Sequence, residues 1–319
     1  MKAIRIHEDG SPEVLRYEDA PDPEPGPGEV LIQLRAASLN RLDLWVRAGL
    51  PSVPKPRILG ADGAGLDLEG RRVVINPGIE HGDRISVVGE HMDGTHAELV
   101  AVPQSNVYPI PDELSFEEAA AFPLVFETAY RMLVTRAGLR EGEWVLVWGA
   151  GSGIGTAAIV LARALGARVV TTSSSDAKVE LARGLGAEAV VNHKTGDVLE
   201  AVREATGGAG ADVVVEHVGE ATWQTSLQAV RAHGRIAVCG ATSGPNPKAA
   251  LHRVWWKQLT ILGSTMGTKE DFEGAFELVK SGKAKPVVDS VYPLAEARAA
   301  HERMEAGEHF GKIVLAIPE

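Results

Sequence analysis

The segment 149–155 carries the residues whose types and spacing point most directly to chemistry, because glycine stands at every second position. An apolar stretch at 144–148 precedes it, an Ala-rich helical stretch follows at 156–165, and β-branched residues resume at 168–172. Such glycines let the backbone turn tightly and approach a pyrophosphate, while the helix start offers free N–H groups and a partial positive charge. This order predicts the first β-α-β unit of a dinucleotide-binding fold.

The tip of the second strand indicates which dinucleotide binds. Folds that prefer NAD place Asp or Glu about 20 residues after the glycine turn, where it accepts hydrogen bonds from the adenosine ribose. Here the strand runs into Ser173 and Ser174, and Lys178 follows, while Asp176 is explained as a first-turn acid of the next helix. Hydroxyl groups and a lysine suit a 2′-phosphate that a carboxylate would repel. The pattern therefore favours NADPH as cofactor.

The chain has two regions that differ in their pattern of apolar residues. Residues 1–110 form short strand-like segments between Pro- and Gly-containing loops, which is typical of an antiparallel barrel or sandwich. Ser115 with Glu118 makes a capping box ahead of a helix. Strands then alternate with helices, which predicts a parallel, doubly wound sheet. The six expected strands lie near 144–148, 168–172, 188–192, 212–216, 235–239 and 259–264.

Composition excludes several kinds of partner. The 319 residues carry a formal net charge of −11 and no block of lysine or arginine, which argues against nucleic acid and anionic membranes. The single cysteine, Cys239, permits no intrachain disulfide and fits a reducing compartment. The N-terminus alternates like a strand and lacks the apolar core of a signal peptide, and no apolar run reaches transmembrane length. We expect a cytoplasmic protein that acts on a small-molecule substrate.

Several segments, taken in order, resemble the medium-chain dehydrogenase/reductase superfamily. The resemblance implies a Rossmann-type doubly wound parallel sheet inserted in a GroES-like β-rich catalytic domain, with a nicotinamide cofactor in the cleft between the two. We expect residues 1–125 to form the first part of the catalytic domain, 126–265 the NADP-binding domain, and 266–319 the C-terminal return. The segments that carry the resemblance are 25–32, 38–43, 59–65, 93–99, 128–130, 149–155, 234–240, 262–266 and 310–315.

The chain departs from the zinc enzymes of this superfamily, which hold a catalytic metal by a Cys, a His-Glu pair and a later Cys. The corresponding positions here are Asn40, Ala61 with Asp62, and Leu124. A catalytic zinc site needs about three nitrogen, sulfur or oxygen ligands from the protein, and these residues do not supply them. We therefore expect no bound metal.

The stretch 76–93 corresponds to the lobe that carries four cysteines around a structural zinc in those enzymes. It contains no cysteine. Its His81, Asp83 and His91 are interpreted as loop residues rather than metal ligands.

The segment 40–49 is similar instead to the zinc-free quinone oxidoreductase branch, and the resemblance implies a catalytic loop of Asn40, Asp43 and Trp45. Asn40 would hydrogen-bond the cofactor ribose or the acceptor oxygen. Asp43 would orient the Asn40 loop or Arg41 rather than act as a base. Relatives have Tyr at the position of Trp45, and because indole lacks that hydroxyl we interpret Trp45 as a side chain lining the cleft.

The remaining cofactor contacts follow from the resemblance and the strand pattern. Thr128 is expected at the nicotinamide ribose, His193 near the adenosine phosphate, and Lys312 at the diphosphate. The full set of expected cofactor-binding residues is Asn40, Thr128, Gly151, Ser152, Gly153, Ile154, Ser173, Ser174, Lys178, His193, Gly240, Thr242, Gly263, Ser264 and Lys312.

A site without a Lewis acid favours acceptors that are already electron-poor. We therefore expect NADPH-dependent hydride transfer to a quinone or an α,β-unsaturated carbonyl, with protein groups positioning the reactants. Two alternatives stay open: an NADP-dependent alcohol dehydrogenase with an unrecognised proton donor, and a non-catalytic NADPH-binding sensor. The resemblance also implies a homodimer through the edge of the Rossmann sheet, with the apolar strand 259–262 as that edge.

Overall fold

The computed structural model describes residues 1–318, which form two compact units. The split unit comprises 1–124 and 286–318, and the inserted unit comprises 125–285. The expected boundary at 125/126 lies one residue from the observed division at 124/125. The expected boundary at 265/266 does not coincide with the observed division at 285/286, and helix α9 explains the difference.

Helix α9 (Lys269–Lys280) belongs to the inserted unit rather than to the expected C-terminal return. Its buried face packs within this unit, and Arg131 donates to Asp271 Oδ2 at 3.2 Å. Thr135 also donates to Asp271. The helix is therefore tied to the segment that precedes the parallel sheet, and the chain returns to the split unit only after it.

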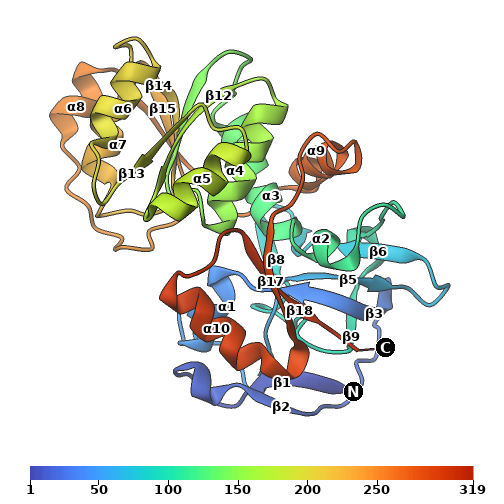
Figure 1. Ribbon diagram of the computed structural model, residues 1–319. Coiled ribbons are helices and arrows are strands. Elements are labelled where there is room, and N and C mark those ends of the chain that lie inside the picture. Colours follow the sequence, from blue (N-terminus) through green and yellow to red (C-terminus); the bar gives the residue numbers. More distant parts are fainter. Residues whose placement is uncertain (319) are drawn as a thin grey trace. The chain divides into compact units, whose positions relative to one another are not determined.

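The inserted unit is built on a six-stranded, all-parallel sheet in the order β13-β12-β11-β14-β15-β16. This confirms the expected doubly wound sheet. Helices α4 and α5 cover one face, and α6, α7 and α8 cover the other (Figure 1). The strands are β11 (Trp144–Val147), β12 (Arg168–Ser173), β13 (Ala189–Asn192), β14 (Ala211–Glu216), β15 (Val230–Val238) and β16 (Thr260–Gly263). The helices are α3 (Pro123–Tyr130), α4 (Gly153–Ala164), α5 (Asp176–Gly184), α6 (Val198–Ala205), α7 (Trp223–Ala229), α8 (Leu251–Trp256) and α9, with a π-helical segment at Arg131–Arg136.

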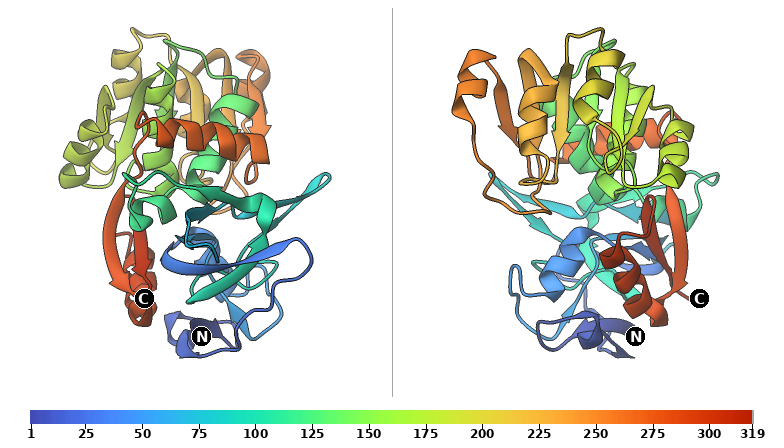
Figure 2. Two further views of the ribbon diagram at one scale, coloured as in Figure 1. Left: turned by 90° about the vertical axis from the view of Figure 1, so that its right-hand side faces the viewer. Right: turned by 60° about the vertical axis from the view of Figure 1, so that its left-hand side comes forward.

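Burial on both faces explains why the sequences of the central strands are continuously apolar and do not alternate between apolar and polar residues. Val145, Leu146 and Val147 of β11 are fully buried, since helices cover both faces of the sheet. The twisted sheet and its two helical layers are visible in the two further views of Figure 2.

The split unit is rich in antiparallel strands, as the alternation in the first 110 residues predicts. Its largest sheet runs β10-β6-β5-β3-β18-β17, with β9 also on β3, and a smaller sheet runs β2-β1-β4. The C-terminal strand β18 pairs antiparallel with β3, which returns the end of the chain to this unit. The strands are β1 (Lys2–Ile6), β2 (Arg16–Asp19), β3 (Glu29–Ser38), β4 (Arg57–Ile58), β5 (Asp62–Leu66), β6 (Arg72–Ile75), β7 (Gly78–His81), β8 (Arg84–Val87), β9 (Leu99–Pro103), β10 (Val107–Pro109), β17 (Val288–Pro293) and β18 (Lys312–Ala316).

Three short α-helices complete the split unit: α1 (Arg41–Arg47), α2 (Phe116–Ala120) and α10 (Ala297–Ala306). The predicted capping box is present, because Glu118 N donates to Ser115 Oγ at 3.1 Å and Ser115 N donates to Glu118 Oε2 at 3.2 Å. Short 3-10 turns lie at Pro12–Val14, Gln104–Asn106 and Leu294–Glu296. Among the described residues, no helix is both long enough and apolar enough to cross a membrane.

Candidate active site

The glycine turn lies between β11 and α4, as the sequence predicts. Ser152 is the N-cap of α4: its Oγ accepts from Gly155 N at 2.9 Å and donates to Gly149 O at 2.9 Å. The hydroxyl therefore closes the turn onto the helix. The N–H groups of Gly153 and Ile154, at the first positions of α4, have no acceptor in the described part of the chain, as is usual for a helix start.

Two of the glycines have geometric reasons to be glycine. Gly149 has φ +62°, a left-handed conformation that side chains disfavour. A Cβ on Gly155 would lie 2.1 Å from Gly149 O. Backbone thus packs on backbone, and the helix N-terminus presents peptide groups rather than side chains. This cradle fits a pyrophosphate.

The parallel register brings most of the expected cofactor residues to one edge of the sheet. Ser173 is opposite Asn192, the last residue of β13, and Val238 is opposite Gly263. His193 N donates to Ser173 O at 2.9 Å, and Ser264 N donates to Val238 O at 2.8 Å. The residues that follow the carboxyl ends of the strands are Gly151, Ser152, Ser174, His193, Gly240, Thr242 and Ser264. Thr128 lies elsewhere in the inserted unit, buried in α3.

Two buried hydroxyl groups at this edge lack a partner. The Oγ atoms of Ser173 and Ser264 are both enclosed and make no hydrogen bond with any residue that the structure describes. A buried polar atom without a partner costs about 1–3 kcal/mol. A ligand that supplies hydrogen-bonding groups at this edge would remove that cost, so the donor set fits a dinucleotide.

The catalytic loop predicted in the split unit is held by Asp43. Asn40 N donates to Asp43 Oδ2 at 2.7 Å, and Gly60 N donates to Asp43 Oδ1 at 3.0 Å. The carboxylate therefore joins the start of α1 to the segment before β5. Trp45, one turn further along α1, has 38% of its surface exposed.

A fully buried carboxylate, Asp62, is the centre of the site. Its Oδ2 accepts from Ser38 Oγ at 3.1 Å, from Asn40 Nδ2 at 2.9 Å and from Lys312 Nζ at 2.9 Å. Its Oδ1 accepts from Leu124 N at 2.8 Å. Four donors from different segments of the split unit thus converge on one side chain. These include two of the positions, Asn40 and Leu124, that correspond to metal ligands in the zinc enzymes.

Lys312 has a different environment from the one expected. The resemblance implies a contact with the cofactor diphosphate; in the structure Lys312 belongs to the split unit and is 2% exposed. Nζ donates to Asn40 Oδ1 at 2.5 Å and to Asp62 Oδ2 at 2.9 Å. The buried carboxylate attracts the ammonium, since a buried charge needs a partner of opposite sign.

Burial sets the ionisation of the groups around this network. It raises the pKa of Asp43 to about 7, outweighing the two backbone donors and the nearby Lys312, which favour the charged form. Burial also lowers the pKa of His96 to about 4. Asp43 is thus the group of this loop that changes charge near neutral pH.

The donor set does not fit a catalytic zinc ion. Asn40 presents its amide to Lys312 and Asp62, Ala61 has no donor, and Leu124 contributes only a backbone N–H, which repels a cation. Within residues 1–318, no cluster of three or more His, Cys, Asp and Glu side chains has the spacing of a metal site. The stretch that corresponds to the structural zinc lobe forms the hairpin of β7 and β8, and His81 is exposed.

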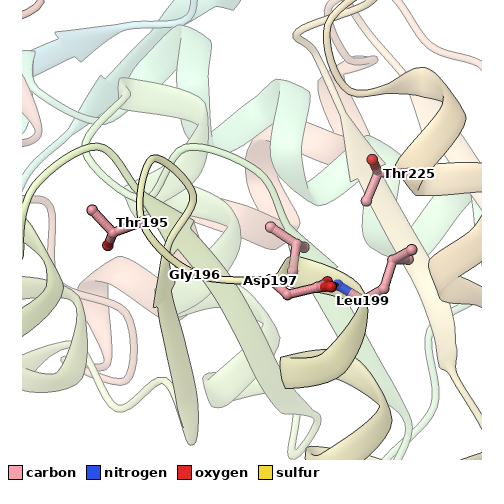
Figure 3. Close-up of a pocket in the computed structure, with 6 residues that line it drawn as sticks. Thr195, Gly196, Asp197, Leu199 and Thr225 are labelled. Carbon is pink, nitrogen blue, oxygen red and sulfur yellow. The ribbon is translucent and has the colours of Figure 1, made fainter.

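A separate hollow lies in the inserted unit at the N-terminus of α6 (Figure 3). It has a volume of about 480 Å³. Asp197 Oδ1 already accepts from the N–H groups of Leu199 and Glu200, at 2.8 and 3.2 Å, so this helix start offers little to an anion. None of the expected cofactor residues lines it; the lining residues are Thr195, Gly196, Asp197, Val198, Leu199 and Thr225.

Sequence reasoning did not predict the buried network in which Asp62 accepts from Ser38 and Lys312. One signal was available: Asp62 is a charged residue in a segment of glycine, alanine and leucine, 59–66. A carboxylate in such a segment predicts burial, and burial predicts a cationic partner. The sequence around Asp62 does not predict that this partner is Lys312, which lies 250 positions away.

Two family models match the chain. One is described as the alcohol dehydrogenase GroES-like domain and covers residues 26–112, and the other as zinc-binding dehydrogenase and covers residues 153–281. The chain is 32% identical to a quinone oxidoreductase of Rattus norvegicus over 330 residues, which span 99% of this chain and 98% of the relative.

Solved structures agree with this likeness. An NAD-dependent alcohol dehydrogenase is 43% identical, with a TM-score of 0.96 and all of both chains covered. A mycobacterial protein in complex with NADPH is 30% identical, with a TM-score of 0.85, over 99% of this chain and 100% of that one. The chain therefore belongs to the medium-chain dehydrogenase/reductase superfamily, in its quinone oxidoreductase-like branch, and it is an oxidoreductase with a GroES-like and a Rossmann-like part.

Proposed function

We propose that the protein reduces a quinone or an α,β-unsaturated carbonyl with NADPH, without a metal ion. The observation that carries this proposal is the network on Asp62. The positions that would bind zinc hold an amide, a methyl group and a backbone N–H, and the first and last of these donate to one carboxylate.

The cofactor part of the proposal rests on the edge of the parallel sheet. NADPH, when bound, supplies the hydride. The turn at 149–155 would hold its diphosphate, and Ser173, Ser174, Lys178 and His193 would hold the adenosine end. Asp176 does not compete for this role, because its Oδ1 accepts from Asn192 Nδ2 at 2.8 Å at the start of α5.

The substrate class follows from what the split unit can do. Reduction of a simple aldehyde concentrates charge on one oxygen and benefits from a metal. A quinone or an enone spreads that charge over a conjugated system, so positioning and hydrogen-bond donors suffice. Trp45, which is 38% exposed on α1 of the split unit, would offer an apolar surface to such a planar molecule.

A panel of acceptors tests the activity. Purified protein with NADPH is mixed with quinones, enones and enals, and the loss of NADPH absorbance is followed. We expect acceptor-dependent oxidation that a chelator leaves unchanged and a zinc content far below one ion per chain. Stoichiometric zinc would overturn the metal-free mechanism, and tight NADPH binding without turnover on any acceptor would indicate a sensor instead.

Ser174→Asp tests the choice of cofactor. A carboxylate at the partly exposed tip of β12 would repel the 2′-phosphate, so NADPH affinity should fall at least about tenfold while NADH affinity changes little. Ser174→Asn is the matched control, because it has the same size without the charge. Fluorescence titration measures both, and tighter binding of NADH than of NADPH by the wild type would contradict the assignment.

One comparison favours a second candidate, an alcohol dehydrogenase. The 43% identical structure is an NAD-dependent alcohol dehydrogenase. Alcohol-dependent reduction of NAD or NADP by the metal-free protein would support this candidate. The increase in absorbance of the reduced nicotinamide with an alcohol as substrate therefore distinguishes an alcohol dehydrogenase from a quinone or enone reductase.

We also propose a homodimer through strand β16. This strand is an edge of the parallel sheet, and Ile261 on it is 42% exposed. Trp255 and Trp256 of α8 are 64% and 76% exposed. An unpaired edge with exposed apolar side chains is a template for pairing with a second copy.

A further inference from the structure

The parallel sheet of the inserted unit changes its winding between two neighbouring strands, β11 and β14. Helix α4, which follows β11, covers one face of the sheet, and α7, which follows β14, covers the other (Figure 1). Such a reversal opens a crevice outside the carboxyl ends of the two strands, where open α/β sheets bind their ligands. His217 is the first residue after β14, so it lies at this crevice, although the sequence pattern did not single it out.

The side chain of His217 bridges the two strands. Its Nε2 lies 2.8 Å from the carbonyl oxygen of Trp148, the residue between β11 and the glycine turn. A carbonyl oxygen can only accept, so Nε2 carries the proton and Nδ1 of the neutral ring is an acceptor. The backbone oxygen of His217 accepts from Thr242 N at 3.3 Å. The residue thus lies between the two segments, 149–155 and 240–242, that are expected to bind the cofactor.

There is room for a ligand against the imidazole. A carbon atom at the Cβ position of Gly149 would lie 3.7 Å from His217 Cε1 and 3.8 Å from His217 Nε2, which is ordinary van der Waals contact. The next heavy atom, Ser152 Oγ, would be 3.9 Å away. Gly149 is partly exposed, and His217 is 9% exposed. Because glycine leaves this position empty, an atom of a bound molecule can contact the Cε1–Nε2 edge of the ring without a clash.

A buried carboxylate, Glu216, fixes this arrangement. Its Oε1 accepts from Val218 N at 2.9 Å, and its Oε2 accepts from Ser226 Oγ at 2.5 Å. Ser226 Oγ in turn accepts from the indole Nε1 of Trp148 at 2.8 Å. Trp148 is therefore held at its side chain by the Glu216 network and at its carbonyl by His217, which keeps the imidazole beside the glycine turn.

We propose that the imidazole of His217 binds the ribose of the nicotinamide half of the cofactor. The proposed function places the diphosphate at the turn 149–155 and the adenosine at the tips of β12 and β13, so the remaining half extends toward β14 and β15. His217 lies on that side of the turn. A ribose hydroxyl group can donate to Nδ1, while the sugar carbons pack on the Cε1 edge. The inference rests on the proposed function for the cofactor, but not for the crevice or the position of the ring.

Comparing the whole cofactor with its adenosine half tests this contact. Adenosine 2′,5′-bisphosphate contains the adenosine end of NADPH but lacks the nicotinamide ribose. His217→Leu should weaken NADPH binding about tenfold and leave the affinity for the bisphosphate unchanged, because one hydrogen bond and the ring contact are lost. Isothermal titration calorimetry measures both affinities. His193→Leu, at the proposed adenosine end, is the matched comparison and should weaken both ligands alike.

A second variant separates the contact from folding. His217→Gln keeps an amide N–H for Trp148 O and a carbonyl oxygen for the ribose, so it should fold and bind NADPH more tightly than His217→Leu. In the wild type, histidine labelled at Cε1 should show a nuclear Overhauser effect between the His217 ring and the nicotinamide ribose of bound NADP. The signal is assigned by its loss in His217→Gln, and it tests the contact even where His217→Leu fails to fold.

The outcomes separate the two proposals. Equal losses for NADPH and the bisphosphate in His217→Leu, or no loss for either, would overturn the contact, as would a wild-type complex without the Overhauser effect. A wild type that binds NADH more tightly than NADPH would contradict the proposed cofactor alone, and NADH with adenosine 5′-diphosphate then replaces the NADPH pair. A protein that shows the His217 contact and turns over no acceptor would support this inference and contradict the proposed function.

Discussion

At the scale of single residues, Asp43 shows burial and hydrogen bonding acting in opposite directions. Two backbone donors favour its charged form, yet burial raises its pKa to about 7. The unfolded chain has the ordinary pKa near 3.8. Between these values the folded state holds a proton that the unfolded state has lost. The contribution of Asp43 to the free energy of unfolding is therefore complete below about pH 4 and is lost as the pH rises to about 7.

Asp43→Asn should remove this pH dependence. His96 and His301 act in the opposite sense, because burial lowers the pKa of each, so the comparison must be between variant and wild type. The variant should be less stable than the wild type at pH 4.5, and this difference in the free energy of unfolding should narrow by about 3 kcal/mol at pH 7.5. Urea denaturation at the two pH values measures it; a gap that does not change with pH would show that Asp43 keeps one charge state throughout.

At the scale of elements, the turn between β11 and α4 depends on the close approach of two peptide groups. Gly155 packs on Gly149 O, and Ser152 ties the turn to the helix by its Oγ. The tight turn brings the α4 N-terminus to the carboxyl edge of the sheet, where the other strand tips lie. A change that moves the helix therefore affects the proposed diphosphate site without touching a ligand.

Gly155→Ala should push α4 away from the turn, because the new Cβ would lie 2.1 Å from Gly149 O. We expect NADPH affinity to fall at least about tenfold and the melting temperature to decrease. Gly184→Ala is the matched control: it lies at the end of α5, where a Cβ would meet nothing within 4 Å, and it should leave affinity unchanged and stability equal or slightly higher. Equal NADPH affinity in both variants would argue against the turn as the diphosphate site.

At the scale of the whole molecule, two edge strands in the described part of the chain expose a large aliphatic side chain. Ile261 lies on β16 of the inserted unit, and Val291, which is 49% exposed, lies on β17 of the split unit. Exposed Trp255 and Trp256, whose ring centroids are 5.6 Å apart, lie on α8, the helix that precedes β16 in the chain. Large aromatic surfaces favour protein interfaces, so the β16 edge is the better candidate for pairing.

Ile261→Lys should therefore shift the protein from dimer to monomer, since a charge on a pairing edge disfavours strand addition. Val291→Lys, the equivalent change on the other exposed edge, should leave the mass unchanged. Sedimentation velocity at several protein concentrations distinguishes the two variants. A monomeric wild type, or a dimer that survives Ile261→Lys, would contradict pairing through β16.

The sequence by itself determined the parts of this protein that depend on local pattern. Glycine spacing, the capping box at Ser115 and the apolar strands predict the parallel sheet and the turn, because these depend on neighbouring residues and on burial of whole strands. The tip residues Ser173 and Ser264 could also be placed, since carboxyl ends of parallel strands share one edge.

Only the tertiary structure decided what the charged groups do. Nothing in the local pattern around Lys312 indicates that its ammonium would lie on Asp62 and Asn40, because those contacts depend on β18 pairing with β3. The place of α9 in the inserted unit depends in the same way on contacts made by Asp271. Ion pairing acts between side chains distant in sequence, so the electrostatics of the site emerge only when the sheet assembles.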